Sequence, residues 1–237
     1  MLFSKLNYKK VDKNKQIKKK HKIYLKKNNK IISIVNDIPL KNKDKTYNMI
    51  CEIPKYTRKK MEINWKLKYN PIQQDLNKDG SLREYKWGDM LFNYGAFPQT
   101  WENPKVRSKF TKKLGDDDPL DVIDIGDAQA ECGMVYKVKL LGVLGMIDQN
   151  EMDWKVIVIN VKDCLAKKIN NINQIEKYKP GVLESIREWL RLYKTVDGKK
   201  KNKFSFNEKY KDKIFALKVI DEVYHEWSNN KKLFVGK

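Results

Sequence analysis

The hydrophobic and polar positions of this 237-residue chain follow two different periodicities. Up to about residue 161, apolar residues recur at every second position or form short runs, and both patterns are typical of β-strands. The near-continuous apolar run Trp154–Ile159 indicates a buried strand. We predict a hairpin over residues 22–35 and strands over residues 49–53, 61–69, 81–85, 121–125, 133–146 and 154–161.

The pattern changes after residue 170. A helix beginning near Pro180 is predicted from apolar residues at i, i+3, i+7 and i+10 spacing, namely Leu183, Ile186, Leu190 and Tyr193. A second helix is predicted over residues 208–228 because one face would carry Leu217, Ile220, Tyr224 and Trp227. Strands followed by helices predict an α+β domain, most simply a barrel with helices packed on it.

Composition supports a folded protein in a reducing compartment. Hydrophobic residues make up 41% of the chain, which is enough for a core. No apolar run approaches the length of a membrane span, and the first residues lack the apolar stretch of a secretory signal. The cysteines, Cys51, Cys132 and Cys164, are odd in number and widely spaced, which indicates free thiols. We expect the cytoplasm, with no membrane partner, and lysine blocks compatible with nuclear entry.

The charge of the chain is strongly positive and unevenly distributed. The formal net charge is +21, and residues 1–50 carry 15 Lys against three Asp. We interpret residues 1–21 as a basic flexible leader and residues 22–237 as the folded domain. Blocks of lysine can bind polyanions, but these lysines cluster with asparagine instead of interleaving with aromatic residues. Nucleic acid is therefore not the partner we expect.

A dense group of acids interrupts this basic background. Residues 116–125 contain five aspartates, and burying like charges together is costly unless cations neutralise them. Hard divalent ions such as Mg²⁺ prefer oxygen ligands. Pro119 argues against a helix, and an extended run would direct Asp116 and Asp118 to the same side. The pattern indicates a site for several metal ions.

A second acidic segment, residues 148–155, lies beside another predicted strand and ends with Lys155. Two such segments can face each other across one cavity. Metals that bridge phosphate oxygens, with nearby cations, are the recurrent parts of phosphoryl-transfer sites, and candidate cations here are Lys60, Arg83 and Lys194. Residues 75–81 match half of an EF-hand loop, but Lys86 takes the place of its final glutamate, so we interpret them as a turn.

These motifs together resemble the eukaryotic-type soluble inorganic pyrophosphatases (family I). The resemblance covers residues 21 to about 227, and the family signature Asp-x-Asp-Pro-x-Asp occurs at residues 116–121. Other matching stretches, in the family order, are residues 37–40, 52–55, 60–63, 70–75, 93–102, 153–157 and 188–194.

The resemblance implies a five-stranded, OB-like closed β-barrel with packed helices, two of them C-terminal. It implies hydrolysis of pyrophosphate to two phosphates by a metal-activated water, with several Mg²⁺ ions and with Mn²⁺ or Co²⁺ as substitutes. By this resemblance Asp118 would accept a proton from the water. The metal ligands it implies are Asp116, Asp121, Asp153, Asp148 and Glu62. The residues it implies for phosphate binding are Arg83, Lys60, Tyr94, Tyr193 and Lys194, supported by Lys155 and Glu52.

The chain departs from the family in two respects. Met90 stands where the family usually has a tyrosine near the phosphate, which predicts a modest loss of rate. The family resemblance implies a homodimer, but Tyr56 replaces a usual contact tryptophan and the chain ends early, at Lys237. Two rival functions stay open: an OB-like nucleic-acid-binding module, and a phosphohydrolase acting on short polyphosphate or nucleotides.

Overall fold

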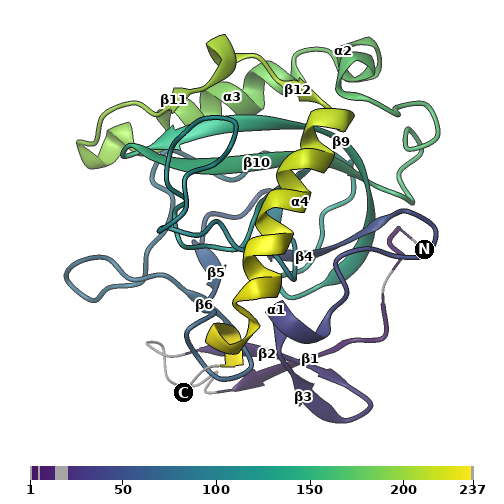
Figure 1. Cartoon of the computed structure of the whole chain (residues 1–237), viewed down its shortest axis with the longest axis vertical. Coiled ribbons are helices and arrows are strands. Elements are labelled where there is room, and N and C mark those ends of the chain that lie inside the picture. The colour runs from purple at the N-terminus through teal and green to yellow at the C-terminus, as the bar shows by residue number, and fades with distance from the viewer. Residues whose placement is uncertain (1, 5, 14–20, 236–237) are drawn as a thin grey trace.

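The computed structural model describes residues 2–4, 6–13 and 21–235, and Figure 1 shows their arrangement. The strands are β1 (Lys9–Lys13), β2 (Lys22–Lys27), β3 (Lys30–Ile32), β4 (Tyr47–Ile53), β5 (Met61–Ile63), β6 (Ile72–Gln74), β7 (Asn93–Ala96), β8 (Asp121–Asp124), β9 (Val135–Asp148), β10 (Glu151–Asn160), β11 (Lys203–Phe204) and β12 (Lys211–Asp212). The α-helices are α1 (Ile34–Asp37), α2 (Ile175–Tyr178), α3 (Val182–Leu192) and α4 (Lys213–Asn229). Short 3₁₀ turns are Ile172–Gln174, Thr195–Asp197, Phe206–Glu208 and Lys231–Val235.

The larger sheet has seven strands and contains the most apolar segments of the chain. Its pairing runs from β10 through β8, β7 and β4 to β9, and β9 also pairs with β10. The strands β11 and β12 add to β9. Nine of the ten residues of β10 are buried, as its apolar sequence predicts. The pair β8–β10 is parallel, and every other pair in this sheet is antiparallel.

The smaller sheet has five strands and includes part of the predicted leader. Its order is β1-β2-β6-β5, with β3 paired to β2. Strand β1 pairs with β2 along residues 9–13, and Phe3 is buried, so these residues pack on the domain and are not the free arm that we expected. Residues 1, 5 and 14–20 of the leader lie outside the described part of the chain. The division at residue 21 stays a prediction.

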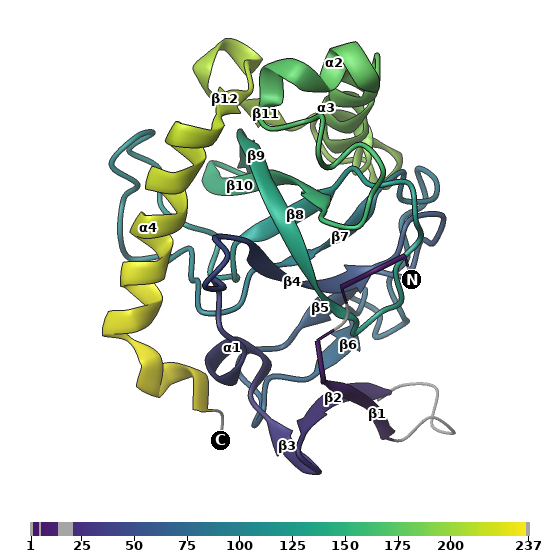
Figure 2. The same cartoon turned by 90° about the vertical axis from the view of Figure 1, so that its right-hand side faces the viewer.

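The two predicted C-terminal helices are present, with corrected boundaries. The helix α3 buries Ile186, Trp189 and Leu190. The helix α4 begins at Lys213 instead of residue 208, because the Asp212 side chain caps it by accepting a hydrogen bond from the N–H of Phe215. Leu217, expected on its buried face, is 38% exposed. The helix α4 crosses the front of the molecule in Figure 1 and lies along one side of it in Figure 2, and it runs from the end with α2 and α3 to the end with β1–β3.

Three strand predictions are wrong in extent. The hairpin over residues 22–35 ends at Ile32, since Ser33 caps the short helix α1. The strand expected over residues 61–69 ends at Ile63, where turn hydrogen bonds begin and the buried Asn70 side chain ties the segment down by donating to the carbonyl of Trp65. Residues 81–85 form only isolated bridges to residues 76 and 59.

The α+β class is confirmed, and the apolar residues that form the core come from both sheets and from the inner faces of α3 and α4. Cys51, Cys132 and Cys164 are free thiols, as predicted. No helix within residues 2–4, 6–13 and 21–235 combines the length and apolarity that crossing a membrane requires.

Candidate active site

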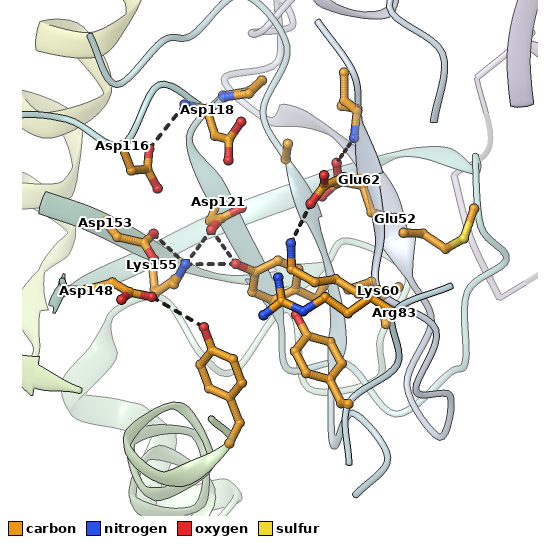
Figure 3. Close-up of a pocket in the computed structure, with 18 of the residues that line it drawn as sticks. Glu52, Lys60, Glu62, Arg83, Asp116, Asp118, Asp121, Asp148, Asp153 and Lys155 are labelled. Atoms are coloured by element: carbon orange, nitrogen blue, oxygen red, sulfur yellow. Dashed lines mark hydrogen bonds and ion pairs between the residues drawn. The ribbon is translucent and has the colours of Figure 1, made fainter. Parts of the chain in front are cut away.

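One polar cavity brings together every site residue predicted from the sequence (Figure 3). Its lining includes all thirteen of them, although they come from widely separated parts of the chain: Glu52, Lys60, Glu62, Arg83, Tyr94, Asp116, Asp118, Asp121, Asp148, Asp153, Lys155, Tyr193 and Lys194. The two acidic segments therefore face one cavity, as predicted.

The parallel pairing of β8 with β10 creates the centre of the site. Lys155 is the register partner of Asp121, and Asp153 lies two residues before Lys155 on the same face of β10. The ammonium of Lys155 is 2.5 Å from Oδ1 of Asp153 and also pairs with Asp121. The hydroxyl of Tyr94, on the neighbouring strand β7, donates to Asp121 and accepts from Lys155 at 2.8 Å.

A tight loop carries the signature aspartates. Asp116 and Asp118 both line the cavity, but the chain between them is not extended, because Asp117 has a φ of 74°. Asp117 instead pairs with Lys66 and accepts a hydrogen bond from Trp101. Gly115 is required here, since a Cβ would lie 2.2 Å from the carbonyl oxygen of Glu102.

Two groups of cations flank the acids. Lys194, two residues after the end of α3, pairs with Asp148, and the hydroxyl of Tyr193 lies 3.5 Å from the same carboxylate. On the other side Lys60 contacts Glu62 at 2.5 Å and Asp75 at 3.1 Å.

Arg83 also pairs with Asp75, at 2.7 Å. Asp75 was placed in a turn and in a stretch that matches the family, but it was not predicted as a site residue, yet it pairs with two cavity cations. These cations lower its pKa, although burial opposes the shift.

Burial and mutual repulsion make the acids costly to ionise together. Burial, with Asp121 and Glu62 nearby, raises the pKa of Asp118 to about 7. Burial and the charge of Asp121 raise the pKa of Asp153 to about 7, with Lys155 opposing the shift. The pKa of Asp116 is raised well above its usual range by burial and by Asp153. A cluster with these properties needs positive charge close by.

The donor set fits a divalent metal ion. Carboxylate oxygens of Glu102, Asp116 and Asp153 lie within 4.8 Å of one another. Oxygen Oε1 of Glu102 accepts the N–H of Trp154 at 3.0 Å, whereas Oε2 is buried without a hydrogen-bond partner among the described residues. An unpartnered buried oxygen beside two aspartates suits a hard cation. Glu102 was not predicted, because its role depends on a contact between distant segments.

Three further polar residues line the cavity without having been predicted as site residues, namely Tyr85, Gln149 and Lys199. The sequence signal for Lys199 was its place in a basic block. Met90, in contrast, is fully buried in the core and does not line the cavity. The Met90 side chain therefore does not face the cavity, although the family resemblance places a tyrosine near the phosphate at this position.

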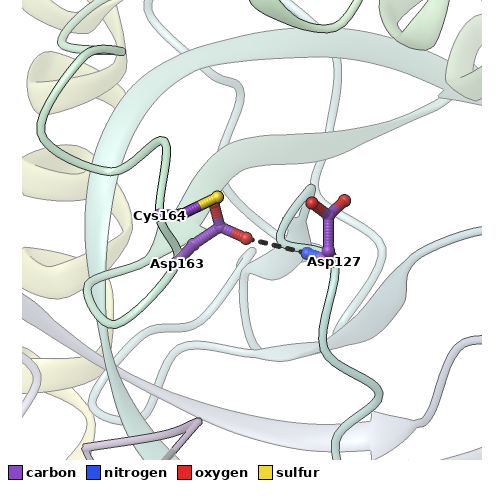
Figure 4. Close-up of side chains that lie close together, drawn as sticks. All are labelled: Asp127, Asp163 and Cys164. Atoms are coloured by element: carbon purple, nitrogen blue, oxygen red, sulfur yellow. Dashed lines mark hydrogen bonds between the residues drawn. The ribbon is translucent and has the colours of Figure 1, made fainter.

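A second acidic group lies apart from this cavity, in Asp127, Asp163 and Cys164 (Figure 4). The oxygens of Asp163 accept backbone N–H groups of Asp127 and Leu165, both at 2.8 Å. Asp127 pairs with Lys179 and is exposed. These contacts account for the cluster as a loop-stabilising arrangement.

Comparisons with known proteins agree with the geometry. The family model described as inorganic pyrophosphatase matches residues 49–228. The inorganic pyrophosphatase of Eremothecium gossypii is 44% identical over 223 residues, which cover 92% of this chain and 76% of that protein. That of Candida albicans is 46% identical over the same shares of the two chains.

Solved structures are also similar. A recombinant inorganic pyrophosphatase from T. brucei brucei superposes with a TM-score of 0.92 at 39% identity, covering 99% of this chain and 73% of that one. An N-terminally truncated vacuolar soluble pyrophosphatase from Trypanosoma cruzi, in complex with PPi, gives 0.90 at 40% identity, with coverage of 97% and 93%. The chain belongs to the inorganic pyrophosphatase family and is a diphosphatase, a hydrolase.

Proposed function

We propose that the cavity hydrolyses inorganic pyrophosphate to two phosphates at a site that holds several Mg²⁺ ions. The observation that carries this proposal is the meeting of two acidic segments with cations from two other segments in one cavity (Figure 3). The Trypanosoma cruzi relative in complex with PPi supports pyrophosphate as the substrate. The proposed metal-holding residues are Asp116, Asp121, Asp148, Asp153 and Glu62.

When bound, Mg²⁺ neutralises clustered carboxylates and phosphate oxygens and lowers the pKa of a coordinated water. Asp118 accepts a proton from the attacking water, whose oxygen forms a bond to one phosphorus as the bridging P–O bond breaks. The bridging oxygen leaves with the second phosphate. Asp118 suits this part because it lines the cavity and none of the described cations forms an ion pair with it.

The cations on the two flanks hold the substrate. Arg83 offers a planar two-pronged donor, whereas Lys60 and Lys194 offer point charges. The hydroxyl groups of Tyr94 and Tyr193 lie beside Asp121 and Asp148 and can turn toward phosphate oxygens. Lys155 keeps Asp121 and Asp153 in place, and Glu52 fixes the edge of β5 by accepting the N–H of Ile63 at 2.6 Å.

Two structural expectations belong with this proposal. The pairing of β9 with both β4 and β10 supports a closed, OB-like five-stranded barrel formed by β4, β7, β8, β9 and β10.

We expect a cytoplasmic enzyme. A homodimer stays a prediction, and sedimentation analysis of the wild-type chain and of Tyr56→Ala, whose native side chain is 63% exposed, tests it.

The decisive experiment is phosphate release from pyrophosphate by the purified chain with Mg²⁺. We expect rapid release that stops with a chelator and falls by about 100-fold or more in Asp118→Asn. Asp117→Asn is the matched control, because Asp117 does not line the cavity. Tripolyphosphate and ATP, with Mg²⁺, Mn²⁺ or Co²⁺, test the broader substrate range. No release from the folded protein with any of these metals would refute the proposal.

A further inference from the structure

The wall of the cavity beside Lys60 and Arg83 contains Tyr85. The segments 58–60 and 83–85 pair in antiparallel fashion about a bridge between Lys59 and Glu84. The N–H of Lys60 donates to the carbonyl of Arg83 at 3.1 Å, and the N–H of Tyr85 donates to that of Arg58 at 2.8 Å. Because side chains alternate along an extended segment, Tyr85 points to the same side as Arg83. Both residues line the cavity.

The ring of Tyr85 packs against two aromatic rings, Trp189 and Tyr193, which stack on each other. It packs edge-on against Trp189, with ring centroids 5.0 Å apart and an interplanar angle of 75°. It packs in the same manner against Tyr193, at 5.4 Å and 84°. The side chain is 8% exposed. Contacts of this kind fix the direction in which the phenol hydroxyl points.

The hydroxyl of Tyr85 differs from those of the other cavity tyrosines. Tyr94 bonds to Asp121 and Lys155, and Tyr193 approaches Asp148. Within the described part of the chain, the Tyr85 hydroxyl has no hydrogen-bond partner, and it is not among the polar atoms sealed from solvent. It therefore opens into the cavity, where a ligand can reach it.

The surroundings of this hydroxyl favour an anionic acceptor. Burial raises the pKa of Tyr85 to about 12, with Lys60 and Lys155 opposing the shift, so the phenol stays a hydrogen-bond donor near neutral pH. Lys60 and Arg83 supply positive charge on the same wall. A protonated hydroxyl beside two cations is matched to an oxygen of a phosphate group.

Met90 explains why this hydroxyl is needed. The family resemblance places a phosphate-binding tyrosine at that position, but Met90 has no hydroxyl, is fully buried and does not line the cavity. Its backbone is also pinned, because its N–H donates to Thr57 and its carbonyl accepts from Tyr56. The cavity hydroxyl on this side comes from Tyr85, five residues earlier in the chain.

We propose that the hydroxyl of Tyr85 donates a hydrogen bond to a phosphate oxygen of bound pyrophosphate beside Lys60 and Arg83, replacing the hydroxyl that is missing at Met90. This makes Tyr85 a substrate-binding residue. The inference rests on the proposed function, since it needs pyrophosphate in the cavity.

The test compares Tyr85→Phe with Tyr210→Phe. Phenylalanine keeps the ring contacts with Trp189 and Tyr193 and removes only the hydroxyl. Tyr210 is a matched control because its hydroxyl donates to the carbonyl of Leu183 at 2.7 Å and lies outside the cavity. We expect Tyr85→Phe to lower kcat/KM for pyrophosphate by about 10- to 100-fold, with an unchanged melting temperature, and Tyr210→Phe to stay within about twofold of wild type.

Binding gives a second readout that does not depend on turnover. In calorimetric titration with imidodiphosphate and Mg²⁺, the dissociation constant of Tyr85→Phe should be higher than that of wild type by about tenfold or more. Equal kcat/KM and equal binding in Tyr85→Phe and wild type would overturn the inference while wild-type hydrolysis leaves the proposed function standing. Equal losses in both phenylalanine variants would overturn it as well. A wild-type chain that releases no phosphate refutes the proposed function itself.

Discussion

The ammonium nitrogen of Lys155 lies 2.5 Å from Oδ1 of Asp153, and both side chains are more than nine-tenths buried. The same nitrogen pairs with Asp121. Burial alone would lower the pKa of Lys155, but the two carboxylates raise it well above its usual range. This lysine therefore holds the two acids together at the centre of the cavity.

Replacing Lys155 leaves these acids without their shared cation. We expect Lys155→Met to reduce the free energy of unfolding by roughly 3 kcal/mol near neutral pH. Without the lysine, the buried carboxylates keep their desolvation penalty but lose the cation that offsets it. Urea unfolding without metal measures this. The control is Lys137→Met, which breaks a surface pair with Asp44 and should cost less than about 1 kcal/mol. Equal costs for the two variants would contradict the role of Lys155.

Asp75 positions both cations on one wall of the cavity. Asp75→Asn weakens the contacts with Lys60 and Arg83, so we expect KM for pyrophosphate to rise by about tenfold, with a smaller change in kcat. Steady-state kinetics separate the two effects. Asp79→Asn serves as the control, because Asp79 caps an exposed turn by accepting from Ser81. A KM that is unchanged in Asp75→Asn would show that the cations position themselves.

The pH dependence of stability follows from the raised pKa values of Asp118 and Asp153. Both rise from 3.8 to about 7, so between these values the folded protein binds more protons than the unfolded chain. The free energy of unfolding of the metal-free protein should therefore be highest on the acid side of this window and fall as the pH rises through about 7. Urea unfolding in chelator at several pH values measures the slope.

The histidines, His21 and His225, do not line the cavity. Asp118→Asn should make the free energy of unfolding depend less steeply on pH, because it removes one of the two titrating carboxyl groups. Mg²⁺ should restore stability on the alkaline side, because it neutralises the carboxylates. Stability that increases steadily from pH about 5 to about 8 in chelator would contradict this explanation.

Glu102 presents an unpartnered oxygen to Asp116 and Asp153. In Glu102→Gln the amide oxygen can still accept the N–H of Trp154, but one negative charge is lost. We expect the affinity for Mg²⁺ to fall by about tenfold and the metal-free protein to become more stable near neutral pH. Calorimetry and thermal denaturation measure these. The control is Glu226→Gln, which changes an acid that accepts a hydrogen bond from Asn103, next to Glu102 in the chain. It should change neither the affinity for Mg²⁺ nor the stability of the metal-free protein.

Much of the site was predictable from local sequence. Two-residue alternation places Asp153 and Lys155 on one face of a strand wherever that strand lies, and the spacing of Asp116, Asp118 and Asp121 around Pro119 identifies a loop that needs cations. The apolar run Trp154–Ile159 likewise determined a buried strand.

Other features depended on contacts between distant segments. The sequence pattern extended a strand to Tyr69, but the buried side chain of Asn70 ended it at Ile63. Periodicity placed Leu217 on the buried face of α4, whereas packing left it 38% exposed. Neither outcome is encoded in the spacing of residues within a single element.

The sequence by itself determined which residue types gather at the site, and it predicts that they bind metal and phosphate. Only the tertiary structure decided that Asp75 pairs with Lys60 and Arg83, that Glu102 lies close to Asp116, and that Tyr85 and not Met90 reaches the cavity. The physical reason is range. Strand alternation and charge repulsion act between neighbours in the chain, whereas the burial of a side chain and its hydrogen-bond partners are set by segments that meet only on folding.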